Sequence, residues 1–159
     1  MTHRILFVCL GNICRSPAAE GVFLRLIEMD GLCDQFSVDS AGTGAWHAGE
    51  RADPRMRSAA AARGIELRST ARQLTARDLE WFDLILTMDD DNLEQTRRLD
   101  PTGRFHDRIK PLASYCRRHR VREIPDPYEG GRDRFEHVLD LLEDACHELL
   151  IRLPTDPRR

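Results

Sequence analysis

Residues 8–17, VCLGNICRSP, contain two cysteines, and Arg15 follows the first of them, Cys9, after five intervening residues. A cysteine thiol has an ordinary pKa of about 8.5, which falls to about 3.5–7.5 beside a cation or a helix N-terminus. The resulting thiolate is a strong nucleophile at neutral pH. The planar guanidinium of Arg15 matches two oxygens of a phosphate group. The pattern C-x5-R therefore predicts attack by sulfur on phosphorus through a cysteinyl-phosphate intermediate, with no metal and no cofactor.

The backbone between these two residues is typical of an anion-binding loop. Gly11 can adopt a positive φ, and Asn12 tolerates the left-handed region better than most residues. Such a conformation turns successive N–H groups inward, and a following helix adds the unpaired N–H groups of its first turn. The Ser16 hydroxyl could donate a hydrogen bond to the thiolate. The predicted phosphate-binding loop comprises Leu10, Gly11, Asn12, Ile13, Cys14, Arg15 and Ser16.

The two cysteines could instead be packing residues, metal ligands or a disulfide pair. Cysteine often packs as a small buried hydrophobe, but a complete C-x5-R-S segment with an internal glycine disfavours that role. A metal site is poorly supported, because Cys9 and Cys14 have C-x4-C spacing and no second cysteine pair follows. A permanent disulfide is disfavoured, because five scattered cysteines are an odd number that favours free thiols in a reducing compartment.

Cleavage of a phosphate ester also needs an acid that protonates the leaving oxygen. Asp126 lies between Pro125 and Pro127 in the segment IPDPYEGGRDRF. The two prolines stiffen the backbone and disfavour a helix, so the carboxylate could be held over a cleft. By itself this segment is typical of a surface turn. Together with the cysteine segment, it predicts that Asp126 is the general acid and then the base that activates water.

Short apolar segments alternate with amphipathic ones along the chain. The expected strands are residues 4–9, 36–42, 82–88 and 108–115. Pro111 weakens the prediction of the last strand. The expected helices are residues 17–30, 53–64, 89–99 and 135–149. This alternation predicts an α/β fold with a parallel sheet, right-handed crossovers and a ligand site at the carboxyl ends of the strands.

The bulk composition is that of one globular domain, with 41% hydrophobic and 32% charged residues among 159. We place the domain at residues 1–153 and a C-terminal tail at residues 154–159. No apolar run reaches the roughly 20 residues of a membrane span. The net charge of −3 provides no basic field for nucleic acid. We therefore expect a cytoplasmic protein with no membrane and no nucleic-acid partner.

Both predicted catalytic segments resemble those of the low-molecular-weight protein-tyrosine phosphatases. CLGNICRSP near the N-terminus and DPY near the C-terminus match the two signatures of that family, and SAGTGAW, ARQLT and TMDDDN match between them. The glycine pair after DPYE is similar to the bacterial branch. The resemblance implies a four-stranded parallel sheet, doubly wound as a flavodoxin-like or Rossmann-like three-layer sandwich. It also implies a phosphotyrosine protein or peptide as substrate, and we expect a monomer or a weak dimer.

The resemblance further implies roles for individual residues. Cys9 becomes the nucleophile, Arg15 the phosphate clamp and Asp126 the general acid. The other implied roles are loop support by Asn12, Ser16 and Ser40, cleft walls at Trp46 and Tyr128, and a redox partner of the nucleophile at Cys14. A disulfide between the two loop cysteines would shield the nucleophile from irreversible oxidation.

One position departs from the family pattern. The family usually has a histidine three residues before the Arg-Gln of its ARQ segment, as part of the network that holds the loop asparagine, and this chain has Ser69 there. We expect Ser69, another side chain or a water molecule to take over that support.

Other activities of the same scaffold are alternatives. Arsenate reductases need an additional pair of cysteines after the third strand, where this chain has only the widely separated Cys116 and Cys146. Protein-arginine phosphatases resemble the motif with threonine at the position of Ile13, so isoleucine favours phosphotyrosine over phosphoarginine. A non-catalytic phosphate-binding redox module is a further alternative, disfavoured because a binding protein needs no Asp126.

Overall fold

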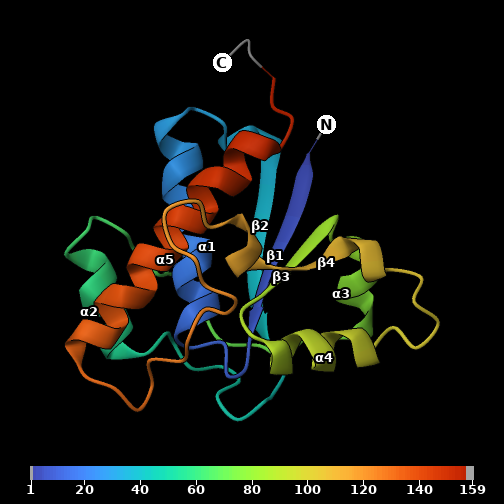
Figure 1. Ribbon diagram of the computed structural model, residues 1–159, viewed down its shortest axis with the longest axis horizontal. Coiled ribbons are helices and arrows are strands. Elements are labelled where there is room, and N and C mark those ends of the chain that lie inside the picture. Colours follow the sequence, from blue (N-terminus) through green and yellow to red (C-terminus); the bar gives the residue numbers. More distant parts are fainter. Residues whose placement is uncertain (1, 157–159) are drawn as a thin grey trace.

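The computed structural model describes residues 2–156 and contains a parallel four-stranded sheet (Figure 1). Its strands are β1 (His3–Cys9), β2 (Phe36–Gly42), β3 (Leu84–Thr87) and β4 (Ile109–Pro111). They are arranged in the order β2-β1-β3-β4, and each neighbouring pair is parallel. Parallel strands require crossover connections, which the intervening helices provide. The predicted four-stranded parallel sheet is confirmed.

Helices cover both faces of this sheet, as Figure 1 shows. One face carries α1 (Arg15–Met29), α2 (Pro54–Ala61) and α5 (Arg132–Arg152), and the other carries α3 (Ala76–Trp81) and α4 (Asp90–Arg98). In β1, Ile5 and Phe7 pack with the first group, whereas Leu6 and Val8 pack with the second. Because successive side chains of a strand point to opposite faces, a continuously apolar strand needs cover on both. The three-layer sandwich is therefore also confirmed.

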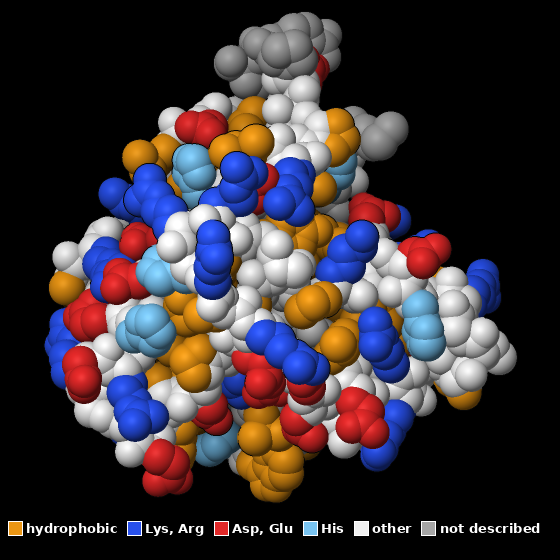
Figure 2. All heavy atoms as spheres, in the orientation of Figure 1, with side chains coloured by type: hydrophobic (Ala, Val, Ile, Leu, Met, Phe, Trp, Pro, Cys, Tyr) orange, Lys and Arg blue, Asp and Glu red, His pale blue; other side chains and the backbone are white. Residues whose placement is uncertain are grey.

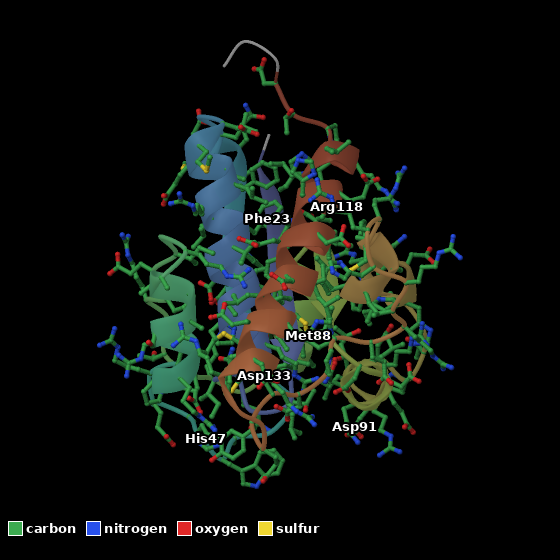
Figure 3. The ribbon with its side chains drawn as sticks, turned by 60° about the vertical axis from the view of Figure 1, so that its left-hand side comes forward. Phe23, His47, Met88, Asp91, Arg118 and Asp133 are labelled. Atoms are coloured by element: carbon green, nitrogen blue, oxygen red, sulfur yellow. The ribbon has the colours of Figure 1, made fainter. Side chains whose placement is uncertain are left out.

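The larger core lies between the sheet and the pair formed by α1 and α5. The Phe23 side chain is fully buried there, with its ring edge-on to that of Phe36 at a centroid distance of 5.3 Å. Figure 3 shows Phe23 on α1, with α5 alongside. Burial of one such side chain contributes about 1.5–3 kcal/mol to stability. This packing fixes the position of α1 and hence of the loop that precedes it.

Two elements differ from the sequence-based expectation. The strand predicted at residues 108–115 ends at Pro111, and Leu112–Tyr115 forms a turn of 3-10 helix. The physical reason is that proline has no N–H to continue the ladder of hydrogen bonds. The six-residue helix α3 was not predicted; a reciprocal capping box between Thr75 and Asp78 stabilises its start.

The carboxyl end of β1 is a topological switch point of the sheet. β2 and β3 lie on opposite sides of β1, so the chain connections diverge from this end. Cys9 is the last residue of β1 and pairs with Gly42, while Thr87 pairs with Val8. Open α/β sheets bind ligands in the crevice that forms at such a point. The cysteine segment therefore lies at the expected ligand-binding end of the fold.

The first and last described residues lie at the opposite end of the sheet (Figure 1). The His3 ring is hydrogen-bonded to the Pro154 carbonyl, and the Gln35 side chain pairs with the backbone of Asp156. Residues 157–159 of the predicted tail lie outside the described part of the chain. No helix within residues 2–156 combines the length and the apolar character needed to cross a membrane.

Acidic and basic side chains are intermixed on the face shown in Figure 2. The arginine-rich segment 117–122 follows this pattern, because Arg117 pairs with Glu148 and Arg122 pairs with Asp90. Part of the basic charge of this segment is thus neutralised by its neighbours.

Candidate active site

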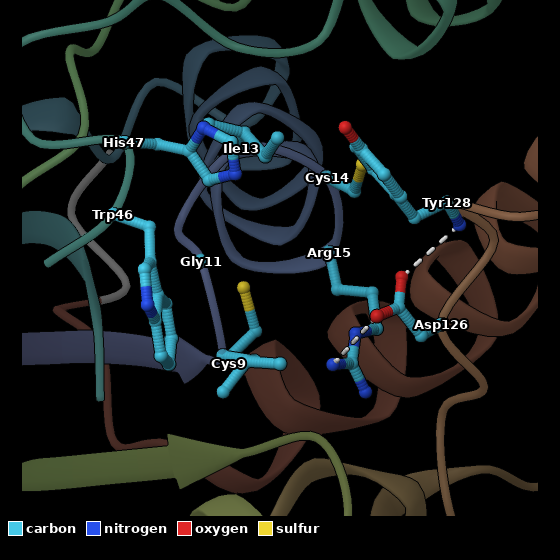
Figure 4. A pocket seen from close by; sticks show the side chains of 10 residues that line it. Cys9, Gly11, Ile13, Cys14, Arg15, Trp46, His47, Asp126 and Tyr128 are labelled. Carbon is cyan, nitrogen blue, oxygen red and sulfur yellow. Dashed lines mark hydrogen bonds and ion pairs between the residues drawn. The ribbon is translucent and has the colours of Figure 1, made fainter. Parts of the chain in front are cut away.

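We call residues 9–16 the Cys9 loop; it connects the last residue of β1 to the first turn of α1. The Cys9 side chain is buried, and its sulfur faces a cavity (Figure 4). Its Sγ lies 3.0 Å from Oγ of Ser16. The first N–H groups of a helix have no partners within the helix, and the helix dipole favours negative charge at that end. The loop therefore surrounds the sulfur with groups that stabilise an anion.

The loop bends at Asn12, whose φ of 57° makes it the one non-glycine residue with positive φ in the described chain. Gly11, which could also have adopted a positive φ, does not do so. Gly11 is needed for space instead: a Cβ there would lie 3.1 Å from Cδ2 of His47, closer than most Cβ contacts. The absence of a side chain lets His47 approach the loop.

Hydrogen bonds from three segments hold Asn12 in its left-handed conformation. Its Nδ2 donates to Oγ of Ser16 at 2.7 Å and to Oγ of Ser40 at 3.0 Å, and its Oδ1 accepts from the Arg72 backbone N–H at 3.0 Å. A non-glycine residue in this region is strained by about 1–2 kcal/mol, which three hydrogen bonds of about 1 kcal/mol each can offset. The predicted contacts of Asn12 with Ser16 and Ser40 are present.

Behind this network lies Glu20, which the sequence did not single out. The Ser40 hydroxyl donates to Oε1 of Glu20 at 2.6 Å, and the Ser69 side chain hydrogen-bonds to the same carboxyl group. Burial raises the pKa of Glu20 above its ordinary value. Ser69, which stands where the family usually has histidine, therefore reaches the loop asparagine through Glu20 and Ser40.

Arg15 is almost fully buried at the start of α1. Its Nη1 donates to Oδ2 of Asp89 at 2.6 Å and to the Ile124 carbonyl at 3.0 Å. Burial opposes the charge, but the nearby Cys9 sulfur and the hydrogen bond to Asp89 raise the pKa of the guanidinium further. The group is therefore a fixed cation whose orientation is set by two partners outside the loop.

Asp126 lies across the cavity from the Cys9 sulfur and belongs to the segment between α4 and α5 (Figure 4). Its side chain is 45% exposed, and its Oδ2 is 3.7 Å from Nη2 of Arg15. Its Oδ1 accepts a hydrogen bond of 3.1 Å from the Tyr128 backbone N–H. The carboxyl group thus borders the same space as the sulfur and keeps contact with solvent.

The space between these groups is a cavity of about 210 Å³. It is lined by Cys9, Leu10, Gly11, Ile13, Cys14, Arg15, Trp46, His47, Asp126 and Tyr128. Trp46 and Tyr128 lie on different sides of the Cys9 sulfur, as the expected walls (Figure 4). Drug-sized ligands occupy roughly 300–1,000 Å³, so this cavity suits a single aromatic ring with one small anionic group. Asn12, Ser16 and Ser40 do not line the cavity.

The Tyr128 wall has its own support. The guanidinium of Arg55 lies 5.2 Å from the Tyr128 ring centre and 4.8 Å from that of Phe135 in α5. Asp53, the N-cap of α2, holds the same guanidinium through Nη2 at 2.8 Å. Cation–π contacts of this kind contribute about 0.5–2 kcal/mol each. Arg55 therefore connects the acid-bearing segment to two helices.

Comparison with known proteins agrees with this geometry. The family model described as low molecular weight phosphotyrosine protein phosphatase matches residues 4–158. The chain belongs to this family. The low molecular weight protein-tyrosine-phosphatase of Streptomyces coelicolor is 45% identical over 152 residues, which cover 94% of this chain and 93% of that protein.

Solved structures of similar proteins match along nearly the whole chain. A protein tyrosine phosphatase from Entamoeba histolytica, with Hepes in its active site, superposes with a TM-score of 0.92 at 41% identity, covering 95% of this chain and 96% of the other. An arginine phosphatase from Drosophila superposes with a TM-score of 0.87 at 30% identity, covering 96% and 98%. The resemblance stated from the sequence to the low molecular weight phosphatases is confirmed.

The second cysteine of the family motif, Cys14, differs from Cys9 in its surroundings. Burial raises the pKa of the Cys14 thiol well above its ordinary value, and the nearby Asp53 carboxylate raises it further. Cys14 is therefore a protonated thiol at neutral pH. Both loop cysteines are free in this structure, and a disulfide between them stays a prediction.

Several residues of this phosphatase site were missed by sequence reasoning. Asp89 is the N-cap of α4 and was not predicted as a site residue; it also pairs with Arg15. Asp89 follows β3, and parallel neighbours end at the same edge of a sheet, so its position along the chain could have indicated this contact. Glu20, His47 and Arg55 carried no such signal. Within residues 2–156, no group of three or more potential metal-ligating side chains converges.

Proposed function

We propose that this protein is a protein-tyrosine phosphatase that hydrolyses aryl phosphate monoesters through a cysteinyl-phosphate intermediate. One observation carries the proposal: the Cys9 sulfur, the Arg15 guanidinium and the Asp126 carboxyl border one cavity of about 210 Å³. A nucleophile, a fixed cation and an acid–base group are the three parts that the reaction needs. The family membership and the aromatic walls support the same conclusion.

In the first step, the Cys9 thiolate forms an S–P bond as the P–O bond to the phenol oxygen breaks. The Ser16 hydroxyl, whose Oγ lies 3.0 Å from the sulfur, donates a hydrogen bond to the thiolate. Arg15 and the N–H groups of the loop stabilise the charge on the three equatorial oxygens. Asp126, protonated before the step, gives its proton to the departing phenolate oxygen. The products are a phenol and the phosphorylated enzyme.

In the second step, the Asp126 carboxylate takes a proton from a water molecule. The water oxygen forms a new P–O bond as the S–P bond breaks, which releases inorganic phosphate and regenerates the thiolate. Asp126 is again protonated and ready for the next cycle. Its partial exposure supports this role, because water can reach it from solvent.

The substrate class follows from the shape of the cavity. The Cys9 sulfur lies below walls formed by Trp46 and Tyr128. The phosphate of phosphotyrosine is separated from the peptide backbone by a ring that can pack between these walls, whereas phosphoserine has no ring. The second candidate activity is that of an arginine phosphatase, because one similar structure carries that name. Ile13, which lines the cavity, supports phosphotyrosine instead.

A panel of matched peptides carrying phosphotyrosine, phosphoserine or phosphoarginine tests the proposal by release of inorganic phosphate. We expect kcat/KM for phosphotyrosine to exceed that for the other two by about 100-fold or more, which corresponds to about 2.7 kcal/mol. The matched variant Ile13→Thr is expected to raise relative activity on phosphoarginine. Faster turnover of phosphoarginine by the unmodified protein would assign the second activity instead.

A further inference from the structure

A second cavity, of about 140 Å³, lies between α1 and the extended segment 64–69, and we call it the α1 groove. Glu20, Leu24 and Arg25 of α1 line one side, and Glu66 and Ser69 contribute to the other. The two sides approach closely, because a Cβ on Gly21 would lie 2.4 Å from Cδ2 of Leu67. The groove is smaller than the roughly 300–1,000 Å³ of drug-sized ligand sites. It can hold a ligand of only a few non-hydrogen atoms.

The groove is connected to the catalytic sulfur by an unbroken chain of hydrogen bonds that begins at Glu20. Oε1 of Glu20 accepts from Oγ of Ser40 at 2.6 Å, and that oxygen accepts from Nδ2 of Asn12 at 3.0 Å. The same Nδ2 donates at 2.7 Å to Oγ of Ser16, which lies 3.0 Å from Sγ of Cys9. A carboxylate at Glu20 can only accept, so it fixes the Ser40 hydroxyl as the donor to it and leaves the Ser40 oxygen for Asn12.

The Glu20 carboxylate retains hydrogen-bonding capacity. A carboxylate has about four acceptor positions, and Ser40 and Ser69 occupy two of them. Nearby charges balance the negative charge of Glu20 only in part. The Asp39 carboxylate repels that charge, whereas the guanidinium of Arg72 attracts it. Because Arg72 is also paired with Asp39 and Asp78, its charge is shared among several carboxylates.

The groove lining carries three carboxylates, Glu20, Glu28 and Glu66, and two guanidiniums, Arg25 and Arg68, so its formal charge is −1. Arg25 donates to the Gly64 carbonyl at 2.8 Å, and Arg68 pairs with Glu66 at 2.9 Å. The groove therefore favours a positive ligand, and a planar ligand with paired N–H donors best matches a carboxylate.

We propose that the α1 groove binds a small planar nitrogen cation of the amidinium or guanidinium class, which donates hydrogen bonds to Glu20 and through Ser40 and Asn12 stabilises the Cys9 loop. This is a binding site separate from the catalytic cavity and goes beyond the proposed phosphatase activity. The occupied groove keeps Glu20 ionised and therefore keeps the direction of every hydrogen bond in the chain. The empty groove leaves the buried carboxyl group more easily protonated.

The test compares acetamidinium with acetamide, which has nearly the same shape but no charge, at neutral pH. Backbone amide resonances of the isotope-labelled protein are followed by NMR with inorganic phosphate present to occupy the Cys9 loop. We expect acetamidinium to shift resonances of residues 64–69 and, through the hydrogen-bond chain, those of residues 11–16. The affinity for acetamide is expected to be lower than that for acetamidinium by about tenfold or more. This readout needs no turnover, so it is independent of the proposed activity.

Three variants complete the experiment. Ser69→His places a ring in the groove and is expected to abolish the shifts at residues 64–69. Glu20→Gln keeps the shape but removes the charge, and it is expected to weaken acetamidinium binding about tenfold. Ser58→His adds the same ring at an exposed position of α2 outside the groove and is expected to bind like the unmodified protein. The thermal unfolding midpoint of each variant shows that it is folded.

Three outcomes would overturn the proposal. Equal affinity for acetamide and acetamidinium would show that the groove does not select a cation. Unchanged binding in folded Glu20→Gln would remove the carboxylate from the site. Shifts confined to residues 11–16 would place the ligand in the catalytic cavity instead.

Discussion

The Cys9 loop and the segment that carries Asp126 face each other across one cavity but are held in different ways. Within the loop, Asn12, Arg15 and Ser16 are at most 2% exposed, and each has a hydrogen bond to another segment or side chain. Asp126 is 45% exposed, and its side chain has one short hydrogen bond, to the neighbouring Tyr128 N–H. The loop proposed to bind the phosphate is therefore preorganised, whereas the proposed acid–base group remains accessible to water.

The physical reason lies in what each part must do. The loop must present fixed dipoles to a transition state, and preorganised dipoles need no rearrangement during the reaction. In the proposed mechanism, Asp126 exchanges a proton with a phenol and then with water, so complete burial would hinder it. Its segment is nevertheless fixed at one end, because the Ile124 N–H donates to the Met88 carbonyl at 2.7 Å and the Ile124 carbonyl accepts from Arg15.

Replacement of Cys9 by serine is expected to have the largest effect, because it removes the sulfur that the Cys9 loop and the Asp126 segment both face. We expect kcat/KM for an aryl phosphate to fall by about 10⁴-fold or more, since a serine hydroxyl stays protonated in the same cage. Binding of inorganic phosphate should persist, which calorimetry can measure. Turnover of Cys9→Ser within tenfold of the unmodified rate would exclude the proposed nucleophile.

Replacement of Asp126 by asparagine tests the exposed half of the site. We expect kcat to fall by about 10²–10⁴-fold for a phenol of high pKa, because no group protonates its oxygen. A substrate with an activated leaving group, such as a nitrophenyl phosphate, should lose much less in the phosphorylation step, measured as the burst of phenol release. Equal losses for both leaving groups would contradict the acid role of Asp126.

Replacement of Asn12 tests how far the loop depends on its internal hydrogen bonds. We expect Asn12→Ala to lower kcat about 10–100-fold through displacement of the loop and to lower the free energy of unfolding by about 1–3 kcal/mol. Asn12→Gly is the matched control, because glycine adopts the positive φ without strain but restores no hydrogen bond. It should recover stability relative to alanine while kcat stays low. Full recovery of kcat with glycine would mean that conformation alone, and not the network, supports the loop.

The smallest effect on catalysis is expected from Asp144 of α5, which anchors the chain upstream of the acid-bearing segment. Its carboxylate accepts from the backbone N–H groups of Arg117, Arg118 and His119 at 2.9–3.0 Å. Burial opposes the charge, but these bonds and the His119 ring lower the pKa of Asp144 overall. We expect Asp144→Asn to lower the free energy of unfolding by about 1–3 kcal/mol at neutral pH, with kcat changed less than about twofold.

The pH dependence of this stability difference has a definite sign. A carboxyl group whose pKa is lower in the folded than in the unfolded state stabilises the protein above its unfolded pKa of about 3.9. That contribution is lost as the pH falls through the folded pKa. Chemical denaturation of both proteins across the acidic range should therefore show the difference between Asp144→Asn and the unmodified chain diminishing below about pH 4. A difference that grows toward acid pH would contradict the assigned role.

Much of the fold and the main candidate residues of the site could be predicted because their signals are local. A strand, a glycine-containing turn and a helix start are contiguous around Cys9, and two prolines bracket Asp126. The alternation of apolar and amphipathic segments indicated the parallel sheet. The sequence shows that both Gly11 and Asn12 tolerate a positive φ but not which of them adopts it; Asn12 does so because residues 16, 40 and 72 supply its partners.

By itself, the sequence determined the chemistry: a thiol, a guanidinium and a carboxyl group at positions whose backbone could present them. Only the tertiary structure decided how each is supported. Asp89 reaches Arg15, and Glu20 reaches Asn12 through Ser40, because the register of the parallel strands brings their ends together. These pairings join segments far apart along the chain, and no local periodicity encodes them. Their geometry is fixed by the packing of α1 and the sheet, which the whole chain determines together.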